Sequence, residues 1–346
     1  MKGRNLVGVV GAVACIASAA VVTGGQATSG WSVPRTPWGD PDLQGTYTNK
    51  TITPVQRPAE LADREFLTKE EATTLERERL QRNEQLLLRP AVRTVVGNVD
   101  QGVDGAPGAY NNFWLDGGTR PTGRTSLIID PPNGRIPGVT PEFEWVAARR
   151  AEGRQGRGPA DGWEDFQLND RCIVWSAGPP IMPGPYNNTY MILQTPDYVV
   201  IEVEMIHDTR IIPLGDRPHL PSSVRQYLGD SRGRWEGDTL VVETTNITRT
   251  NGDPGTQGSD VIGLRAANGR TDDTIRVIER FTPVDTDSFE YEFTIEDLSR
   301  WTRDFSGAFP FERVDGHLYE YACHEGNYSM WTMLAGERLL ERAASR

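Results

Sequence analysis

Alternating apolar and polar residues in the second half of the chain predict β-strands. From Phe289 to Glu296, aromatic and aliphatic residues alternate with Glu and Thr, the pattern of a strand with one buried and one solvated face. Shorter stretches between turn residues predict further strands at 43–47, 126–130, 190–193, 198–206, 209–213, 239–245, 274–281, 316–322 and 328–334. Many short strands joined by turns predict a mainly β fold, an antiparallel up-and-down barrel, with a β-sandwich as the alternative.

Two segments have the residue pattern of surface helices. Thr68 followed by Glu71 is a capping-box sequence, and the run after it is strongly helix-forming. Pro141 starts a second helix that is expected to reach about Arg150. Residues 28–66 are rich in Pro and polar residues and lack periodicity, so they predict an extended N-terminal arm. The expected architecture is therefore a barrel with this arm and one or two surface helices.

The first 27 residues have the features of a signal peptide. Lys2 and Arg4 give a charged start, an apolar run follows, and Gly25-Gln26-Ala27 has the small-x-small form of a cleavage site. The alternative is a retained membrane anchor, which a short run rich in Gly and Ala does not favour. The sequence predicts a periplasmic or secreted protein, with 28–66 as the arm and 67–346 as a single β-rich domain.

The charge of the chain argues against two classes of partner. There are 36 Lys and Arg against 48 Asp and Glu, which gives a net charge of -12. Proteins that bind nucleic acid, and polybasic proteins that bind membrane surfaces, need a basic face. The sequence therefore predicts a small-molecule partner, with no nucleic acid and no membrane after signal cleavage, and it leaves the oligomeric state open.

Two cysteines remain once the signal peptide is removed. In an oxidising compartment, Cys172 and Cys323 are expected to form a disulfide, with two buried thiols as the alternative. The bridge would hold His324 and Glu325 close to Arg171. A histidine beside a carboxylate is suited to acid–base chemistry near neutral pH. The alternative for this string is a tight loop whose polar side chains cap backbone N–H groups.

Two further histidines lie close to predicted strand ends. His207 follows an apolar run in period-two register, which places it on the core-facing side at the rim of the barrel if the strand stays regular. Asp216-Arg217-Pro218-His219 is a rigid turn that displays a guanidinium and an imidazole, and Arg is well suited to hold a carboxylate or phosphate. The alternatives are a partly buried histidine and a structural ion pair between Asp216 and Arg217.

Together these residues predict an exported, cofactor-independent acid–base enzyme, a lyase, isomerase or hydrolase. It would act on a small organic or glycosidic substrate in a barrel pocket. His207 and His324 would be base and acid, Glu325 would orient His324, and Arg210 or Arg217 would stabilise developing negative charge. The alternative is a binding protein without chemistry.

Other side chains enter as binding candidates. Tyr110-Asn111 and Tyr186-Asn187 pair an aromatic ring with an amide, a combination suited to polar organic ligands or sugars. No cofactor is predicted, but a divalent metal remains an alternative. In a metal-dependent hydrolase, His207, His219 and His324 would bind the ion together with Glu325 or Asp216.

Motifs in residues 171–244 and 317–330 carry a family resemblance. They are Arg171-Cys172, Tyr186-Asn187-Asn188, His207, Arg210, Asp216-Arg217-Pro218-His219, Gly229-Asp230-Ser231, Trp235-Glu236-Gly237-Asp238-Thr239-Leu240 and Tyr321-Ala322-Cys323-His324-Glu325-Gly326-Asn327. With these motifs the chain resembles a widespread family of secreted bacterial proteins of unknown function, which implies export and a β-rich fold. Gly45-Thr46-Tyr47 is similar to the Gly-x-Trp that opens lipocalin-like barrels, with Tyr in the Trp place.

Overall fold

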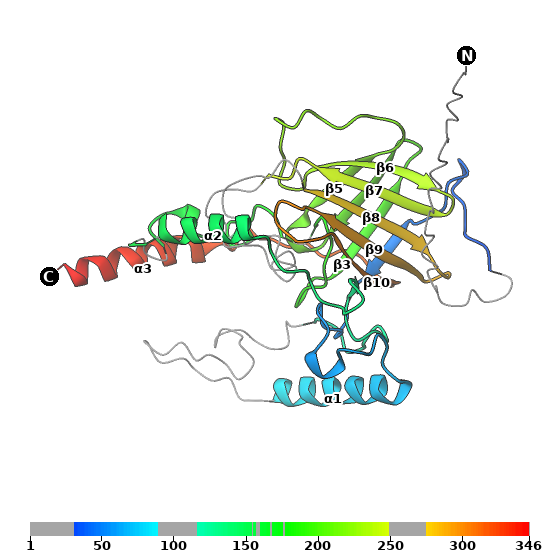
Figure 1. Cartoon of the computed structure of the whole chain (residues 1–346), viewed down its shortest axis with the longest axis horizontal. Helices are drawn as coiled ribbons and strands as arrows, with labels where there is room; N and C mark the ends of the chain where they lie inside the picture. The colour runs from blue at the N-terminus through cyan, green and yellow to red at the C-terminus, as the bar shows by residue number, and fades with distance from the viewer. Residues whose placement is uncertain are drawn as a thin grey trace, which may run out of the picture.

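The structure is a computed structural model that describes residues 31–88, 116–153, 155–156, 160–166, 168–175, 177–248 and 275–345. Figure 1 shows a β-barrel, with helix α1 set apart from it and helices α2 and α3 projecting to one side. The predicted signal peptide and Tyr110-Asn111 lie outside the described residues. Within the described part of the chain, no helix combines the length and the apolar character needed to cross a membrane.

Nine strands of the described residues form a nearly closed antiparallel barrel. Their order around the sheet is β5, β4, β3, β1, β10, β9, β8, β7, β6, and a tenth strand, β2, pairs with β10 off this path. Because β3 to β5 and β6 to β10 are each consecutive neighbours, the predicted up-and-down barrel is confirmed. The bounds are β1 Gly45–Thr48, β2 Ile128–Asp130, β3 Thr189–Gln194, β4 Tyr198–Val203, β5 Thr209–Pro213, β6 Asp230–Glu236, β7 Thr239–Thr245, β8 Arg276–Pro283, β9 Ser288–Glu296 and β10 Phe305–Arg313.

The barrel closes at a seam between β5 and β6. Nine strands paired antiparallel leave the two end strands parallel to each other, so the regular ladder does not continue across this gap. The contact is a single parallel bridge between Leu214 and Gly233, and the Gly215 N–H donates to the Gly233 carbonyl at 3.1 Å. A Cβ on Gly233 would lie 2.8 Å from Leu214 Cδ2, so the close approach of the two strands depends on this glycine.

Aromatic side chains fill the barrel interior along β9 and β10. The alternation predicted for β9 is confirmed, because Phe289, Tyr291 and Phe293 are all buried. Phe289 stacks on Phe311 of β10 with ring centroids 4.8 Å apart, and Tyr291 lies 5.2 Å from Phe309. The segment before β3 also enters the core through its buried Ala177, Ile181 and Met182. The predicted barrel interior is therefore largely a packed core.

The two predicted helices are present. Helix α1 (Lys69–Leu88) starts at the expected capping box, in which the Thr68 N–H donates to Glu71 Oε2 at 2.8 Å and the Glu71 N–H donates to Thr68 Oγ1 at 3.2 Å. It buries none of its residues, as expected for a surface helix. Helix α2 (Pro141–Gly153) begins at the predicted proline.

The predictions for the C-terminal segment are wrong. Residues 316–322 form no strand, and the predicted strand at 328–334 is the start of helix α3 (Tyr328–Ala344). The aromatic and Thr residues of this stretch favour strands. However, the Asn327 side chain accepts the Met330 N–H at 3.4 Å, and Leu, Ala, Glu and Arg continue the helix beyond residue 334.

Two strands were not predicted, and each has a physical reason. The inward positions of β6 are occupied by Ser231, Gly233 and Trp235, and with a single large apolar residue among them no apolar alternation is visible. In β10, Pro310 interrupts the pattern. This proline pairs with β9, while the partners on the other edge of β10 contact it only at residues 306–307 and 312–313, so no ladder is broken there.

Candidate functional site

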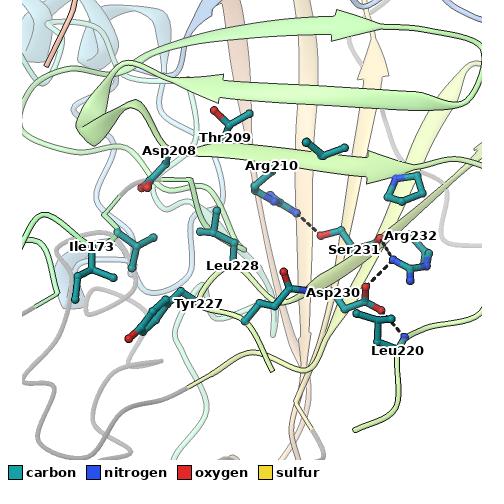
Figure 2. Close-up of a pocket in the computed structure, with 15 residues that line it drawn as sticks. Ile173, Asp208, Thr209, Arg210, Leu220, Tyr227, Leu228, Asp230, Ser231 and Arg232 are labelled. Carbon is teal, nitrogen blue, oxygen red and sulfur yellow. Dashed lines mark hydrogen bonds and ion pairs between the residues drawn. The ribbon is translucent and has the colours of Figure 1, made fainter. Parts of the chain in front are cut away.

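A cleft of about 710 Å³ lies along the seam between β5 and β6. Figure 2 draws the side chains that line this cleft. Its apolar lining includes Ile173, Val174, Ile211, Leu220, Tyr227 and Leu228. Its polar lining includes Asp208, Arg210, Asp230, Ser231 and Arg232. The cleft forms because the seam lacks a regular ladder, and it combines apolar walls with a few charged groups.

A buried ion pair forms the floor of the cleft. Arg210 and Glu279 point inward from β5 and β8, and their side chains are almost fully shielded from solvent. Arg210 Nη1 donates to Glu279 Oε1 at 2.9 Å and Nη2 donates to Glu279 Oε2 at 2.5 Å. Burial alone would lower the pKa of Arg210, but the charge and hydrogen bonds of Glu279 raise it above its ordinary value. The Arg210 guanidinium is therefore held as a cation by a two-point contact.

Hydrogen bonds extend this pair into a polar cluster. The Tyr291 hydroxyl donates to Glu279 Oε1 at 2.8 Å and accepts the Ile181 N–H at 2.9 Å. Burial, followed by the negative charge of Glu279, raises the pKa of Tyr291 well above its ordinary value, so the hydroxyl stays protonated. Arg210 Nη1 also donates to the Ala177 carbonyl at 3.3 Å. The cluster thus fixes the core-filling segment 177–182 against the strands.

Ser231 and Thr244 complete the cluster on the β6 and β7 side. Their hydroxyls lie 2.8 Å apart, and Arg210 Nη2 donates to Ser231 Oγ at 3.3 Å, as Figure 2 shows. These hydroxyl side chains take inward positions where the other strands carry apolar residues. Small polar residues on this side leave room for the long Arg210 side chain.

Asp208 is a second buried group of the cleft. Its Oδ2 accepts the Trp175 N–H at 2.8 Å. Burial raises the pKa of Asp208 to about 6, although the N–H groups of Trp175 and Ala177 and the nearby His207 act in the opposite direction. Within the described residues, no ion pair includes Asp208. Its carboxyl group can therefore gain or lose a proton close to neutral pH.

A charged group lies at the edge of the cleft, on the outer face of β6. His219 Nδ1 is 2.8 Å from Asp230 Oδ2, and Arg232 Nη1 donates to Asp230 Oδ1 at 2.6 Å. The other ring nitrogen of His219 lies 3.5 Å from Glu243 Oε1. The predicted turn 216–219 therefore brings an imidazole to the site through Asp230, which sequence reasoning had not selected.

The predicted position of His207 is wrong. Strand β4 ends at Val203, and Met205–His207 form a short 3-10 helix in which Ile206 and His207 have φ angles of 59° and 48°. This backbone turn breaks the period-two register, so His207 is exposed and Asp208 is buried instead. Its predicted role in catalysis is not supported by this position.

Asp216 and Arg217 are exposed on the turn after β5 and are absent from the lining of the cleft. Arg217 Nη1 donates to the Tyr198 hydroxyl at 2.9 Å, and its guanidinium lies over the Tyr198 ring. Within the described residues, no ion pair joins Arg217 to Asp216, which was the structural alternative. Arg217 serves instead to hold the turn against β4.

The predicted disulfide is present. Cys172 and Cys323 are bonded with their Cα atoms 5.8 Å apart, and the bridge joins residues separated by 151 positions. His324 and Glu325 beside it are exposed and do not line the cleft. Asn327 Nδ2 donates to the Asp170 carbonyl at 2.8 Å, so this string has a clear structural role at the start of α3.

The remaining candidates are dispersed. Asn187 Nδ2 donates to Glu204 Oε1 at 2.8 Å, and the Tyr186 ring packs edge-on against Trp175. Tyr110 and Asn111 lie outside the described residues. In the described part of the chain, no three or more His, Cys, Asp or Glu side chains are grouped so that they could hold a metal ion. The structure therefore does not assemble His207, His219 and His324 as ligands.

Sequence reasoning selected Arg210 but missed its partners. Glu279 falls in the apolar register of a predicted strand with Val277 and Phe281, which is a signal for a buried charge. Arg210 had no such signal, because Ile211 and Ile212 follow it in both registers of its strand. Asp208 had no such signal, because its burial depends on the turn at residues 205–207. No protein-family model matches this chain, and no curated protein matches it either.

Proposed function

We propose that this protein binds a small, partly apolar organic molecule in the cleft at the β5–β6 seam. The observation that carries the proposal is the cleft itself, whose volume of about 710 Å³ lies within the range of small-molecule sites. Apolar walls and a few fixed polar groups are the usual composition of such sites. The two hydrogen bonds between Arg210 and Glu279 support the binding proposal further, because they hold the Arg210 side chain, which lines the cleft, in one position.

We also propose that the protein is exported. The Cys172–Cys323 disulfide supports this part, because structural disulfides persist mainly in oxidising compartments. We propose further that the chain belongs to the secreted bacterial family that its motifs resemble. We also propose that it has no nucleic-acid or membrane partner. N-terminal sequencing of the protein recovered from the periplasm or medium tests the export, since residue 28 is the expected first residue.

The binding proposal can be tested with a neutral probe. Titration of the full chain with 2-phenylethanol is expected to give a Kd of roughly 1 mM, as is usual for a ligand of this size. Ile211→Trp places a large ring on the outer face of β5, where Ile211 lines the cleft, and is expected to abolish binding. Leu193→Trp is the matched control, because Leu193 is also exposed on a strand but lies outside the cleft.

Two results would contradict the binding proposal. One is the absence of binding to the native protein. The other is equal binding to native protein and the Ile211→Trp variant, which would place the probe elsewhere. Thermal melting of both Trp variants shows whether each is folded before binding is compared.

A second candidate is the acid–base enzyme expected from the sequence, now located in the seam cleft. The observation that favours it is Asp208, whose pKa of about 6 suits a general acid or base. The His219–Asp230 pair at the edge of the cleft is a further proton acceptor and donor. This version of the enzyme uses neither His207 nor His324, which are exposed.

A panel of nitrophenyl esters and glycosides tests this second candidate. Turnover is expected to depend on a group with a pKa of about 6 and to be lost in Asp208→Asn. Turnover that Asp208→Asn leaves unchanged would exclude Asp208 as the reacting group. If the native protein turns over none of the panel while it binds 2-phenylethanol, the binding function alone is retained.

A further inference from the structure

The charges of the seam cleft are unequally compensated. Four charged side chains line it, namely Asp208, Arg210, Asp230 and Arg232. The two arginines each hold a carboxylate, since Arg210 pairs with Glu279 and Arg232 pairs with Asp230. Asp208 is the charged lining residue without an ion pair in the described part of the chain. The cleft therefore has an excess of negative charge when Asp208 is ionised.

Both guanidinium groups are occupied by more than one acceptor. The terminal nitrogens of Arg210 donate to Glu279, to the Ala177 carbonyl and to the Ser231 hydroxyl. Arg232 donates to Asp230, to the Ser231 carbonyl and, through Nε, to the Pro218 carbonyl at 3.0 Å. Arg210 Nε is buried without a partner in the described part of the chain, but an anion that approached the terminal nitrogens of either arginine would have to displace these bonds. A carboxylate or phosphate is therefore a poor match for the cleft.

The region around Asp208 is suited to a cation with an apolar body. In Figure 2, Ile173, Tyr227 and Leu228 lie on the same side of the cleft as Asp208, away from Asp230 and Arg232. A positive charge beside a buried carboxylate gains Coulomb energy that solvent screens only weakly. An aromatic ring such as that of Tyr227 adds a favourable surface for an ammonium group.

We propose that the seam cleft is selective for organic cations, in which an ammonium group pairs with Asp208 and an apolar body contacts the walls. This inference rests on the proposed binding function and specifies its ligand class. The Arg210–Glu279 and Arg232–Asp230 pairs have a defined part in it, because they neutralise the remaining charges of the site.

The pH dependence of binding follows from the groups around Asp208. The titratable and charged side chains to consider are His207 beside Asp208, Arg210 and Tyr227 in the lining of the cleft, and Asp230 and Arg232 at its other side. Burial raises the pKa of Asp208 to about 6, so its carboxylate is present at pH 7.5 and largely protonated at pH 5. The Asp208→Asn variant isolates the contribution of Asp208, because it keeps every other charged group of the cleft.

Three probes of similar shape test the inference on the full chain by calorimetry. They are 2-phenylethylammonium, neutral 2-phenylethanol and anionic 3-phenylpropanoate. At pH 7.5 the ammonium is expected to bind about tenfold more tightly than the alcohol, and the anion more weakly than both. At pH 5 the preference for the ammonium is expected to fall to about twofold or less.

Asp208→Asn is expected to remove the preference for the ammonium at pH 7.5 while 2-phenylethanol still binds. Asp315→Asn is the matched control, because Asp315 is exposed on the loop after β10, and this variant is expected to keep the preference. If Asp208→Asn does not fold, the comparison of pH 7.5 with pH 5 on the native protein still decides the result.

The outcomes separate the two proposals. Equal affinity for ammonium and alcohol, or tightest binding of 3-phenylpropanoate, would overturn the cation selectivity and leave the binding function standing. Binding of none of the three probes would overturn the binding function itself. A cation preference that persists in Asp208→Asn would assign it to another group and would also overturn the inference.

Discussion

The interior of the barrel is filled by different kinds of side chain around β9 and β10 and around the β5–β6 seam. Around β9 and β10, neighbouring rings such as Phe289, Phe311 and Tyr291 contact one another and form a continuous aromatic core. Around the seam, the interior holds the Arg210–Glu279 pair and small residues of β6 instead. The aromatic side is stabilised by buried apolar area, whereas the seam side depends on an ion pair and its hydrogen bonds, which leave only Nε of the Arg210 guanidinium without a partner among the described residues.

This difference explains where the cleft lies. Rings from adjacent strands interdigitate on the aromatic side, so the interior there is closed. On the seam side, the described residues of β5 and β6 meet through a single bridge between Leu214 and Gly233, and the cleft lies along this interrupted pairing. The charged groups of the cleft thus lie at the part of the barrel where regular strand pairing stops.

The largest expected effect is the loss of the buried charge pair. Glu279→Gln leaves Arg210 buried without an anion and is expected to lower the free energy of unfolding by about 3–5 kcal/mol. Chemical denaturation measures it. The double variant Arg210→Met/Glu279→Leu is the control, because removing both charges should recover most of this loss. If Glu279→Gln were as stable as the native protein, the seam side would not depend on this pair.

The next effect is a pH dependence of stability caused by Asp208. Its pKa is raised from 3.8 to about 6 in the folded state, so the folded state binds the proton more tightly than the unfolded state. The contribution of Asp208 to stability is therefore present below pH 3.8 and is lost as the pH rises through about 6. Relative to Asp208→Asn, the native protein should lose about 2 kcal/mol between pH 4 and pH 7.

Denaturation of both proteins across this pH range measures the difference between them, which cancels the titration of all other groups. A constant difference would contradict the buried position of Asp208. A difference that grows with pH in favour of the native protein would show that the carboxylate, and not the acid, is the form that the fold stabilises.

The aromatic side could be predicted from sequence because its pattern is local. From Phe289 to Glu296, Phe, Tyr and Ile alternate with Glu and Thr, so the sequence alone gives the buried face of β9. The capping box at Thr68 and Glu71 is local as well, and the predicted start of helix α1 agrees with the structure. The disulfide followed from the expected removal of Cys15 with the signal peptide, which would leave two cysteines.

The seam side could not be predicted because its residues become meaningful only when distant strands meet. Ser231 and Gly233 are inward-facing, but nothing in their local sequence distinguishes them from turn residues. Arg210 was selected to stabilise negative charge that develops during a reaction, whereas the fold supplies Glu279 as its partner from 69 positions away. Asp208 is buried through the positive φ angles of Ile206 and His207, which break a strand that the apolar pattern predicted to continue.

A smaller effect is expected from widening the seam itself. Gly233→Ala introduces a methyl group 2.8 Å from Leu214 Cδ2 and 3.0 Å from Ile212 Cγ2, so these side chains or the strands that carry them must shift. The expected loss of stability is about 1–3 kcal/mol, and binding of 2-phenylethanol should weaken with it. Gly138→Ala is the matched control, because open space surrounds the new methyl group, and it should leave binding unchanged. Gly237 is unsuitable as a control because its φ angle is positive, so that alanine there would strain the backbone.

The smallest effect is expected for an ion pair on the barrel exterior. Glu236 contacts Arg234 and Arg280 at 2.6 Å and 2.9 Å, distances similar to those of the buried pair, yet all three side chains are well exposed. Solvent screens these charges, so Glu236→Gln should change the free energy of unfolding by about 0–1 kcal/mol, against the 3–5 kcal/mol expected for Glu279→Gln. Raising the salt concentration should shrink the Glu236 effect and leave the Glu279 effect nearly unchanged, because screening acts mainly on exposed charges. Equal effects of the two substitutions would mean that burial does not distinguish the seam interior from the outer surface.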